Sequence, residues 1–167
     1  MPAPLDPACL FTVLAEHDVD YVLIGGLAAV LHGSTAMTND ADIVPARTDE
    51  NLRHLSQALI ELEARLRVPE NPEGLDFEPH PALLSSIAML NMTTRCGDLD
   101  MTFSPAGLTD YDNLVTNSAT FELAGRRVKV AALADIIRSK ETAGRAKDQA
   151  TLPILYALAE EINRRET

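Results

Sequence analysis

Two aspartates separated by one residue, Asp40 and Asp42, follow the diglycine Gly25-Gly26 after thirteen intervening residues. The diglycine ends an apolar run at residues 21–24, which predicts a strand. Side chains two residues apart on a strand point to the same face, so Asp40 and Asp42 project together if their segment is extended. Two carboxylates that close repel each other. They are best tolerated at the mouth of a sheet, where a divalent cation can neutralise them.

The surrounding residues favour chemistry on a nucleoside triphosphate. Mg²⁺ prefers oxygen ligands and is often held by one or two carboxylates together with substrate phosphates. Gly25 and Gly26 offer backbone that a phosphate can approach without an intervening side chain. Residues 27–31 are predicted to form a helix, whose amino end favours anions. Taken singly, the diglycine is more often an ordinary tight turn, and the aspartates a solvated or capping pair.

The spacing resembles the signature of the polymerase-beta-like nucleotidyltransferase superfamily: an apolar residue, Gly-Gly or Gly-Ser, roughly ten residues, then Asp-apolar-Asp-apolar. Here the pattern is Ile24-Gly25-Gly26 followed by Asp40-Ala41-Asp42-Ile43, with a gap at the long end of the family's range. The resemblance implies an α/β (α+β) nucleotidyltransferase minimal fold, in which a mixed β-sheet is flanked by helices. It also implies Mg²⁺ or Mn²⁺ as cofactor and an NTP as donor substrate.

A third carboxylate on a neighbouring strand is expected from that superfamily. Asp100, flanked by Leu99 and Met101, fits best, and Asp98 is the second choice because it faces the same side. The implied metal ligands are therefore Asp40, Asp42 and Asp100. Alternatively, residues 95–98 form only a hairpin turn between strands at 87–94 and 99–103, and that turn is compatible with a metal role for Asp100.

A second resemblance lies in the carboxy-terminal third. Residues 140–148 are similar to the Lys-x-x-Ala-x-Arg-x-Lys-Asp element of the AbiEii and MenT group of nucleotidyltransferase toxins. The preceding residues 128–137 resemble the strand and helix that lead into this element. The similarity runs from about Tyr21 to Leu155 and includes these further pieces: Gly26-Leu27-Ala28, His32-Gly33 and Thr38-Asn39-Asp40-Ala41-Asp42.

The resemblance assigns roles to this element. Lys140, Gly144, Lys147 and Asp148 share one face if the helix is continuous. Lys140 is expected to bind the triphosphate, and Asp148 either to orient that cation or to accept the proton of the attacking hydroxyl. A solvated helix face with an ordinary Lys–Asp pair is the alternative. The residues expected to bind the nucleotide are Gly25, Gly26, Thr38, Lys140, Arg145 and Lys147.

One departure from the group's pattern concerns an arginine. The group commonly has Arg two residues before the Thr of Thr-x-Asp-x-Asp, where this chain has Ala36. Either Arg47, Arg95 or Arg145 supplies the missing cation, or nucleotide binding is weakened.

Composition bounds the class of protein. The chain has 167 residues, 46% of them hydrophobic, which suits one domain with a core at about residues 20–131 and a helical segment at about 132–167. No apolar run is long enough for a membrane span, and residues 1–7 lack the pattern of a signal peptide, so a cytoplasmic protein without membrane contact is expected. Cys9 and Cys96 are expected to be reduced and structural.

The formal net charge of −11 disfavours a broad nucleic-acid-binding surface. Seven of the 14 basic residues nevertheless lie within the 22 positions 126–147, which either form a local positive face or balance acidic helices. An acidic surface also suits a cationic antitoxin or an aminoglycoside.

Several further elements are expected from local patterns. Asp6 or Pro7 begins a helix through about His17, and the pattern predicts a hairpin at residues 121–130 and an irregular loop at 68–81. His32 either contacts substrate or serves in capping or packing. Helices are expected at 132–142, at 147–164, and from Asp49 onward with these leucines at helical spacing: Leu52, Leu55, Leu59, Leu62 and Leu66.

These observations lead to one functional hypothesis and two alternatives. The hypothesis is a nucleotidyltransferase that moves an NMP from an NTP to an acceptor hydroxyl; by resemblance, the acceptor is the tRNA 3′ end and the protein is the toxin of a toxin–antitoxin pair. The first alternative is an antibiotic adenylyltransferase of the aminoglycoside type. The second is a degenerate domain that only binds a nucleotide or a partner. The motif constrains the donor half of the reaction far more than the acceptor.

Overall fold

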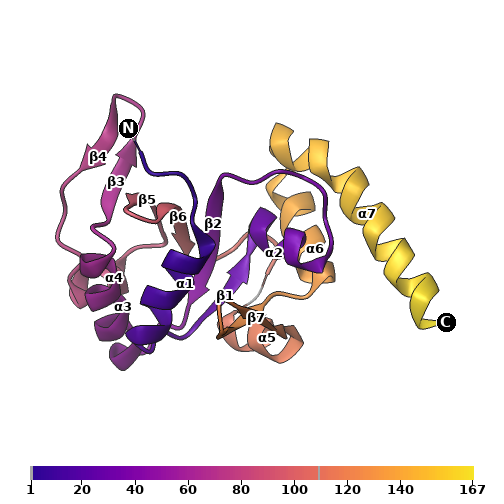
Figure 1. Ribbon diagram of the computed structural model, residues 1–167, viewed down its shortest axis with the longest axis horizontal. Helices are drawn as coiled ribbons and strands as arrows, with labels where there is room; N and C mark the ends of the chain where they lie inside the picture. The colour runs from indigo at the N-terminus through magenta and orange to yellow at the C-terminus, as the bar shows by residue number, and fades with distance from the viewer. Residues whose placement is uncertain (1, 109) are drawn as a thin grey trace.

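The computed structural model describes residues 2–108 and 110–167. Within them an eight-stranded sheet has the order β4-β3-β5-β6-β2-β1-β8-β7, with helices packed around it (Figure 1). The strands are β1 (Tyr21–Ile24), β2 (Asp40–Pro45), β3 (Arg65–Val68), β4 (Asn71–Leu75), β5 (Met89–Thr94), β6 (Gly97–Thr102), β7 (Ala119–Leu123) and β8 (Arg126–Val130). The helices are α1 (Pro7–Glu16), α2 (Gly25–His32), α3 (Asp49–Glu61), α4 (Pro81–Ser86), α5 (Tyr111–Asn117), α6 (Leu133–Ala143) and α7 (Ala146–Glu166).

The sheet is mixed, as the sequence predicts. β2 runs parallel to β6 and antiparallel to β1, and β1 runs parallel to β8. The central strands are buried on both faces, so they are almost wholly apolar apart from the aspartates; Val22, Leu23 and Ile43 are fully buried. The buried centre of the sheet fixes the backbone that carries the aspartates.

Helix α3 ends earlier than its leucine spacing predicts. It begins after Thr48, whose side chain accepts a hydrogen bond from the Asn51 amide. It ends where Glu63 takes a left-handed backbone conformation (φ 53°) and the amide of Ala64 donates to the carbonyl of Leu59. The prediction that Leu66 continues the helix is therefore wrong: Leu66 lies on β3.

The predicted irregular loop at residues 68–81 is wrong in part: residues 71–75 form β4, whereas residues 76–80 are irregular. β3 and β4 form an antiparallel hairpin at one edge of the sheet, and α4 begins at Pro81. Pro72 is compatible with β4 because an edge strand has one side free of ladder hydrogen bonds.

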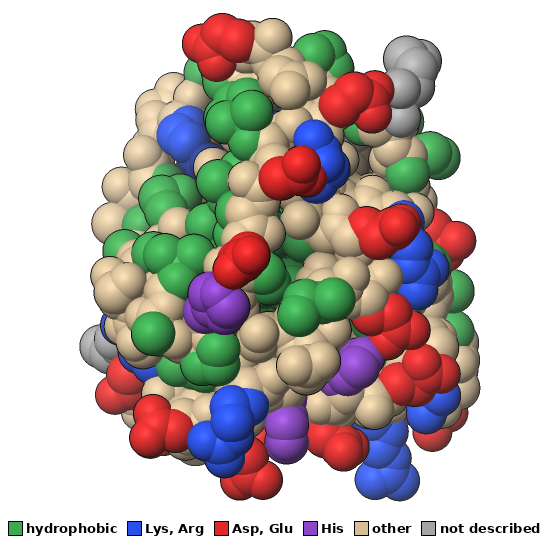
Figure 2. Space-filling view, turned by 90° about the vertical axis from the view of Figure 1, so that its left-hand side faces the viewer, with side chains coloured by type: hydrophobic (Ala, Val, Ile, Leu, Met, Phe, Trp, Pro, Cys, Tyr) green, Lys and Arg blue, Asp and Glu red, His purple; other side chains and the backbone are tan. Residues whose placement is uncertain are grey.

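Figure 2 views the end of the molecule that carries β3 and β4. It shows basic side chains scattered among acidic and apolar ones, without a continuous basic patch on that face.

The carboxy-terminal elements confirm the predicted hairpin and both helices. α6 ends at Gly144, which has a left-handed backbone conformation (φ 62°), and α7 starts anew at Ala146. The helix carrying the Lys140 motif is thus interrupted rather than continuous. α6 packs against both α2 and α7, and α7 runs along the side of the molecule away from β3 and β4 (Figure 1).

Cys9 and Cys96 form a disulfide with a Cα–Cα distance of 5.6 Å, so the expectation that they are reduced is corrected. The amide of Asp6 donates to the carbonyl of Cys96 at 2.8 Å, which holds the start of α1 beside the turn between β5 and β6. The two cysteines are 87 residues apart in sequence, and only this packing brings them together. No helix in the described part of the chain is long and apolar enough to cross a membrane.

Candidate active site

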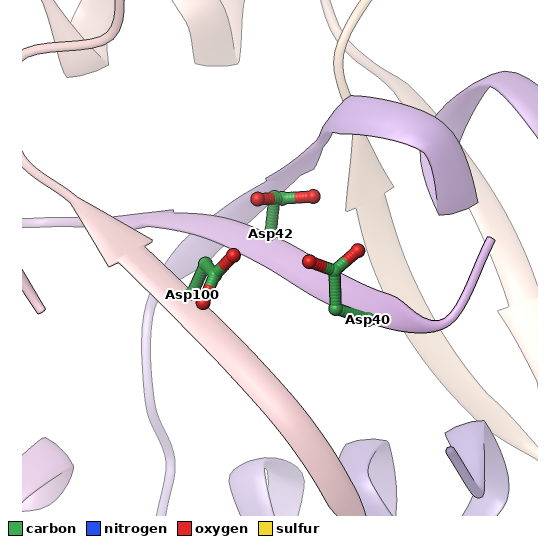
Figure 3. Close-up of side chains that lie close together, drawn as sticks. All are labelled: Asp40, Asp42 and Asp100. Atoms are coloured by element: carbon green, nitrogen blue, oxygen red, sulfur yellow. The ribbon is translucent and has the colours of Figure 1, made fainter. Parts of the chain in front are cut away.

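Strand register brings three carboxylates together. On β2 the aspartates alternate with buried Ala41, and β6 runs alongside with Asp42 opposite Asp100 and Asp40 opposite Asp98. One carboxylate oxygen each from Asp40, Asp42 and Asp100 lie within 4.8 Å of one another. Figure 3 shows the three side chains converging from the two neighbouring strands. The grouping expected from sequence is present.

The close packing of these carboxylates alters their acidity. Burial, followed by the charges of Asp40 and Asp100, raises the pKa of Asp42 to about 7, against the opposing charges of Lys147 and Lys140. Burial and a hydrogen bond with Asp40 raise the pKa of Asp100 to about 6, against the guanidinium of Arg67. The group therefore retains protons up to near-neutral pH when nothing else neutralises it.

This donor set suits a divalent cation. All three ligands are carboxylate oxygens, which Mg²⁺ and Mn²⁺ prefer, and they already approach one another on adjacent strands. Burial and then the charges of two neighbouring aspartates raise the pKa of Asp42, and a cation in this position would offset that negative charge. Asp40, Asp42 and Asp100 thus fit the metal role expected of them.

The diglycine lies directly against this group. Gly25 has φ +71°, in the left-handed region that glycine favours, and a Cβ built on it would lie 2.4 Å from Oδ2 of Asp42. A Cβ on Gly26 would lie 3.0 Å from Oγ1 of Thr38, whose hydroxyl donates to the carbonyl of Asp40 at 3.1 Å. Helix α2 begins at Gly25 without a side-chain cap, so its amino end remains available to an anion.

Basic residues from α6 and α7 meet around one buried carboxylate. Asp148 is fully buried and accepts from Nε of Arg145 at 2.7 Å and from Nζ of Lys140 at 3.3 Å. Burial opposes ionisation of Asp148, but the hydrogen bond and charge of Arg145, with those of Lys140, outweigh it and lower the pKa. The break at Gly144 folds the two helices so that Lys140 and Asp148 still meet, as expected of a single helix face.

A cavity of about 320 Å³ joins these parts. Its lining includes both glycines, two of the clustered aspartates and the basic residues of the carboxy-terminal motif: Gly25, Gly26, Thr38, Asp40, Asp42, Asp98, Lys140, Arg145 and Lys147. Asp100 and Asp148 are not among the lining residues, but each lies next to residues that are. Asp100 is close to Asp40 and Asp42, and Asp148 pairs with Lys140 and Arg145.

Of the three arginines considered as substitutes at Ala36, Arg145 alone lines this cavity. The guanidinium of Arg47 lies over the ring of Phe103, 4.2 Å from its centroid. Arg95 donates from Nε to the carbonyl of Glu61 at 3.0 Å. Both side chains are thus bound outside the cavity.

His32 has a packing role. Its Nε2 lies 2.8 Å from the carbonyl oxygen of Ala131, and its ring meets the edge of Phe121 at a centroid distance of 5.5 Å. It does not line the cavity.

One residue in contact with the aspartates was not anticipated. Arg67 of β3 donates from Nη2 to Oδ1 of Asp100 at 2.5 Å and lies 3.3 Å, through Nη1, from Oδ2 of Asp98. The alternation in Arg65-Leu66-Arg67-Val68 is a strand pattern and offered a local signal. No pattern in the nearby sequence, however, predicts that this strand lies close to β6 in the sheet.

No protein-family model matches the sequence, and no curated protein matches it. Solved structures do match. A lincosamide antibiotic adenylyltransferase with lincomycin bound has a TM-score of 0.58 at 14% identity, covering 93% of this chain and 99% of its own. The antibiotic-resistance factor ANT(2″)-Ia has a TM-score of 0.51 at 15% identity, covering 95% and 92%. A Thermotoga maritima protein assigned as a nucleotidyltransferase has a TM-score of 0.52 at 16% identity, covering 90% and 94%.

These similarities establish the fold. The chain has the mixed-sheet α+β nucleotidyltransferase fold, over nearly its full length, as the first resemblance implied. The narrower similarity to the AbiEii and MenT toxins has no counterpart among these structures and stays a prediction.

Proposed function

We propose that the protein transfers a nucleoside monophosphate from an NTP to an acceptor hydroxyl and releases pyrophosphate. The observation that carries this proposal is the shared cavity, where clustered carboxylates and a phosphate-accessible glycine turn face three basic side chains. That combination supplies anionic groups for a divalent cation and cationic groups for a polyphosphate. The nucleotidyltransferase fold of the chain supports the same reaction class.

Each group has a proposed task. Asp40, Asp42 and Asp100 would hold Mg²⁺ or Mn²⁺, which when bound would neutralise phosphate charge and lower the pKa of the attacking hydroxyl. The backbone at Gly25 and Gly26 lies open to a phosphate, with Thr38 beside it. These residues form the wall of the cavity nearest the reacting phosphate.

Three basic residues of the same cavity would bind the rest of the triphosphate. Lys140, Arg145 and Lys147 present three positive charges to the cavity. Asp148 fixes the first two in place, because it is buried and bonded to both. Its lowered pKa makes it a weak proton acceptor, so we assign it the orienting role rather than that of general base.

The acceptor is the less constrained half of the reaction. The motif at residues 140–148 supports the 3′ end of tRNA, and with it a toxin that a cognate antitoxin protein binds. A second acceptor class is a cationic antibiotic. It is supported by the net charge of −11 and by the fold shared with a lincosamide adenylyltransferase and ANT(2″)-Ia.

The test is transfer of label from each α-labelled NTP in the presence of Mg²⁺. Total tRNA, a lincosamide and an aminoglycoside are supplied as separate acceptors, and pyrophosphate release is followed in parallel. Asp42→Ala should abolish transfer, while Asp49→Asn, on the exposed first turn of α3, serves as the matched control and should retain it. Label on tRNA supports the toxin, and label on an antibiotic supports the resistance enzyme. Absence of both transfer and NTP binding would support a degenerate domain.

A further inference from the structure

Arg67 bridges two carboxylates of β6 from a strand that is not its neighbour. β3 pairs with β5, and β5 with β6, so the side chain reaches across β5 to Asp98 and Asp100. It also donates from Nη1 to the carbonyl of Met92, on the intervening strand, at 3.2 Å. The guanidinium is thus anchored between the two aspartates.

The two halves of this bridge are unequal. The contact to Oδ1 of Asp100 is short, at 2.5 Å, whereas the contact to Oδ2 of Asp98 is 3.3 Å. Oδ1 of Asp98 is buried and is the only such side-chain atom without a hydrogen-bond partner among the described residues. Asp98 therefore has an oxygen without a partner, and an arginine fork pairs best with both oxygens of one carboxylate.

We propose that Arg67 is a positioning residue that neutralises Asp100 until a divalent cation binds, and then transfers to Asp98. This inference rests on the proposed function, because it assumes that Asp100 is a metal ligand. An oxygen of Asp100 that is bonded to Arg67 is only partly available to a cation, and two positive charges on one carboxylate oppose each other. Asp98 lies two residues away on the same face of β6, so the guanidinium moves a short distance and remains paired.

The exchange makes a specific prediction about metal affinity. Arg67 competes with the cation for Asp100, so its removal should tighten metal binding, opposite to the loss expected if Arg67 merely supported the fold. Asp98 helps the cation by accepting Arg67, so its removal should weaken metal binding only while Arg67 is present. The two effects should therefore be coupled.

The experiment is isothermal titration of the metal-free protein with Mn²⁺, without nucleotide. Arg67→Met should bind Mn²⁺ at least about tenfold more tightly than the intact protein, and Asp98→Asn about fivefold less tightly. In the Arg67→Met background, Asp98→Asn should have little further effect. Arg145→Met is the matched control, because it removes a cation of the same cavity that contacts Asp148 instead of the three clustered aspartates; it should change Mn²⁺ affinity less than Arg67→Met.

Each other outcome counts against the exchange. Unchanged or weaker Mn²⁺ binding by Arg67→Met, or an equal effect of Asp98→Asn in both backgrounds, would overturn it while leaving the metal site in place. If the intact protein and Asp42→Asn alike bind no Mn²⁺, the proposed metal site fails too. Should Arg67→Met not fold, Arg67→Gln takes its place. Its amide carries no charge to compete with the cation for Asp100, so tighter Mn²⁺ binding supports the exchange and unchanged binding overturns it.

Discussion

Gly25 and the carboxylate of Asp42 are in such close contact that a Cβ on Gly25 would lie 2.4 Å from Oδ2 and 2.9 Å from Cγ. A glycine is therefore needed here for two reasons: the backbone is left-handed, and Asp42 leaves no space for a side chain. Gly25→Ala should cost about 1–2 kcal/mol in backbone strain and should also displace Asp42. We expect loss of most nucleotide transfer and weaker Mn²⁺ binding, measured on the purified variant.

A second glycine separates these two effects. Gly125 has a similar backbone conformation, with φ +75°, but a Cβ there would meet no atom within 4 Å. Gly125→Ala should lose a comparable amount of stability in a urea titration and keep its transfer activity. Equal losses of activity in both variants would show that general destabilisation, rather than displacement of Asp42, is responsible.

The clustered aspartates should make the metal-free protein less stable as pH rises. Asp42 has a pKa of about 7 and Asp100 of about 6 in the folded state, both above the ordinary 3.8, so the folded protein binds more protons than the unfolded one in this interval. The free energy of unfolding should therefore fall between about pH 4 and pH 7. Thermal unfolding in EDTA should show a Tm roughly 3–8 °C lower at about pH 7.5 than at about pH 5.

Substitution of Asp42 tests the source of that pH dependence. Asp42→Asn should flatten the change in Tm over this range, and Asp49→Asn should not. The lowered pKa of Asp148 acts with the opposite sign and below about pH 4, because its contribution is lost as pH falls through the folded value. A Tm that rises with pH in the intact, metal-free protein would contradict the raised pKa values of Asp42 and Asp100.

Removal of the buried Asp148 should affect both stability and nucleotide binding. Asp148→Ala leaves Lys140, whose side chain is only 14% exposed, without its partner and frees Arg145. We expect a loss of about 2–4 kcal/mol in the free energy of unfolding and weaker NTP binding. Urea titration and a fluorescent NTP analogue measure the two effects.

An exposed ion pair on the same helix provides the control. Glu160 and Arg164 are 3.9 Å apart and more than two-thirds exposed. Glu160→Ala should change stability by less than about 1 kcal/mol and leave NTP binding intact. Normal NTP binding by Asp148→Ala would contradict the orienting role of this carboxylate.

The disulfide between Cys9 and Cys96 should contribute substantially to stability. It closes a long loop, with a sequence separation of 87, for which loop entropy gives about 4–5 kcal/mol. Cys9→Ser, Cys96→Ser and treatment of the intact protein with dithiothreitol should lower the Tm by similar amounts. The reductant should have no effect on either variant. A Tm of the intact protein that is insensitive to reductant would show that the bond does not persist in solution.

Local sequence patterns predicted much of the fold. The strand before Gly25, the strand carrying Asp40 and Asp42, the hairpin at residues 121–130 and the two carboxy-terminal helices are confirmed. Each depends on apolar periodicity or turn residues within a few positions. The structure brings Asp100 close to Asp40 and Asp42, as the resemblance led us to expect, and their role as metal ligands stays a prediction.

Errors arose where backbone conformation or an edge strand overrode the local pattern. Leucine spacing continued through Leu66, but the left-handed turn at Glu63 ended α3 and began β3. Prolines and Gly74 indicated a loop, yet β4 is held at the sheet edge by its pairing with β3. The single helix face proposed for Lys140 and Asp148 required a continuous helix, whereas Gly144 ends α6.

By itself, the sequence determined the short segments that carry the glycine turn and the paired aspartates, since the local geometry of these segments is set by their own residues. Only the tertiary structure decided which distant groups meet them. Arg67 reaches Asp100 because β3, β5 and β6 are neighbours in the sheet, and Cys9 reaches Cys96 because α1 starts beside a distant turn. Such pairings depend on strand order and packing over the whole chain, and no single segment encodes them.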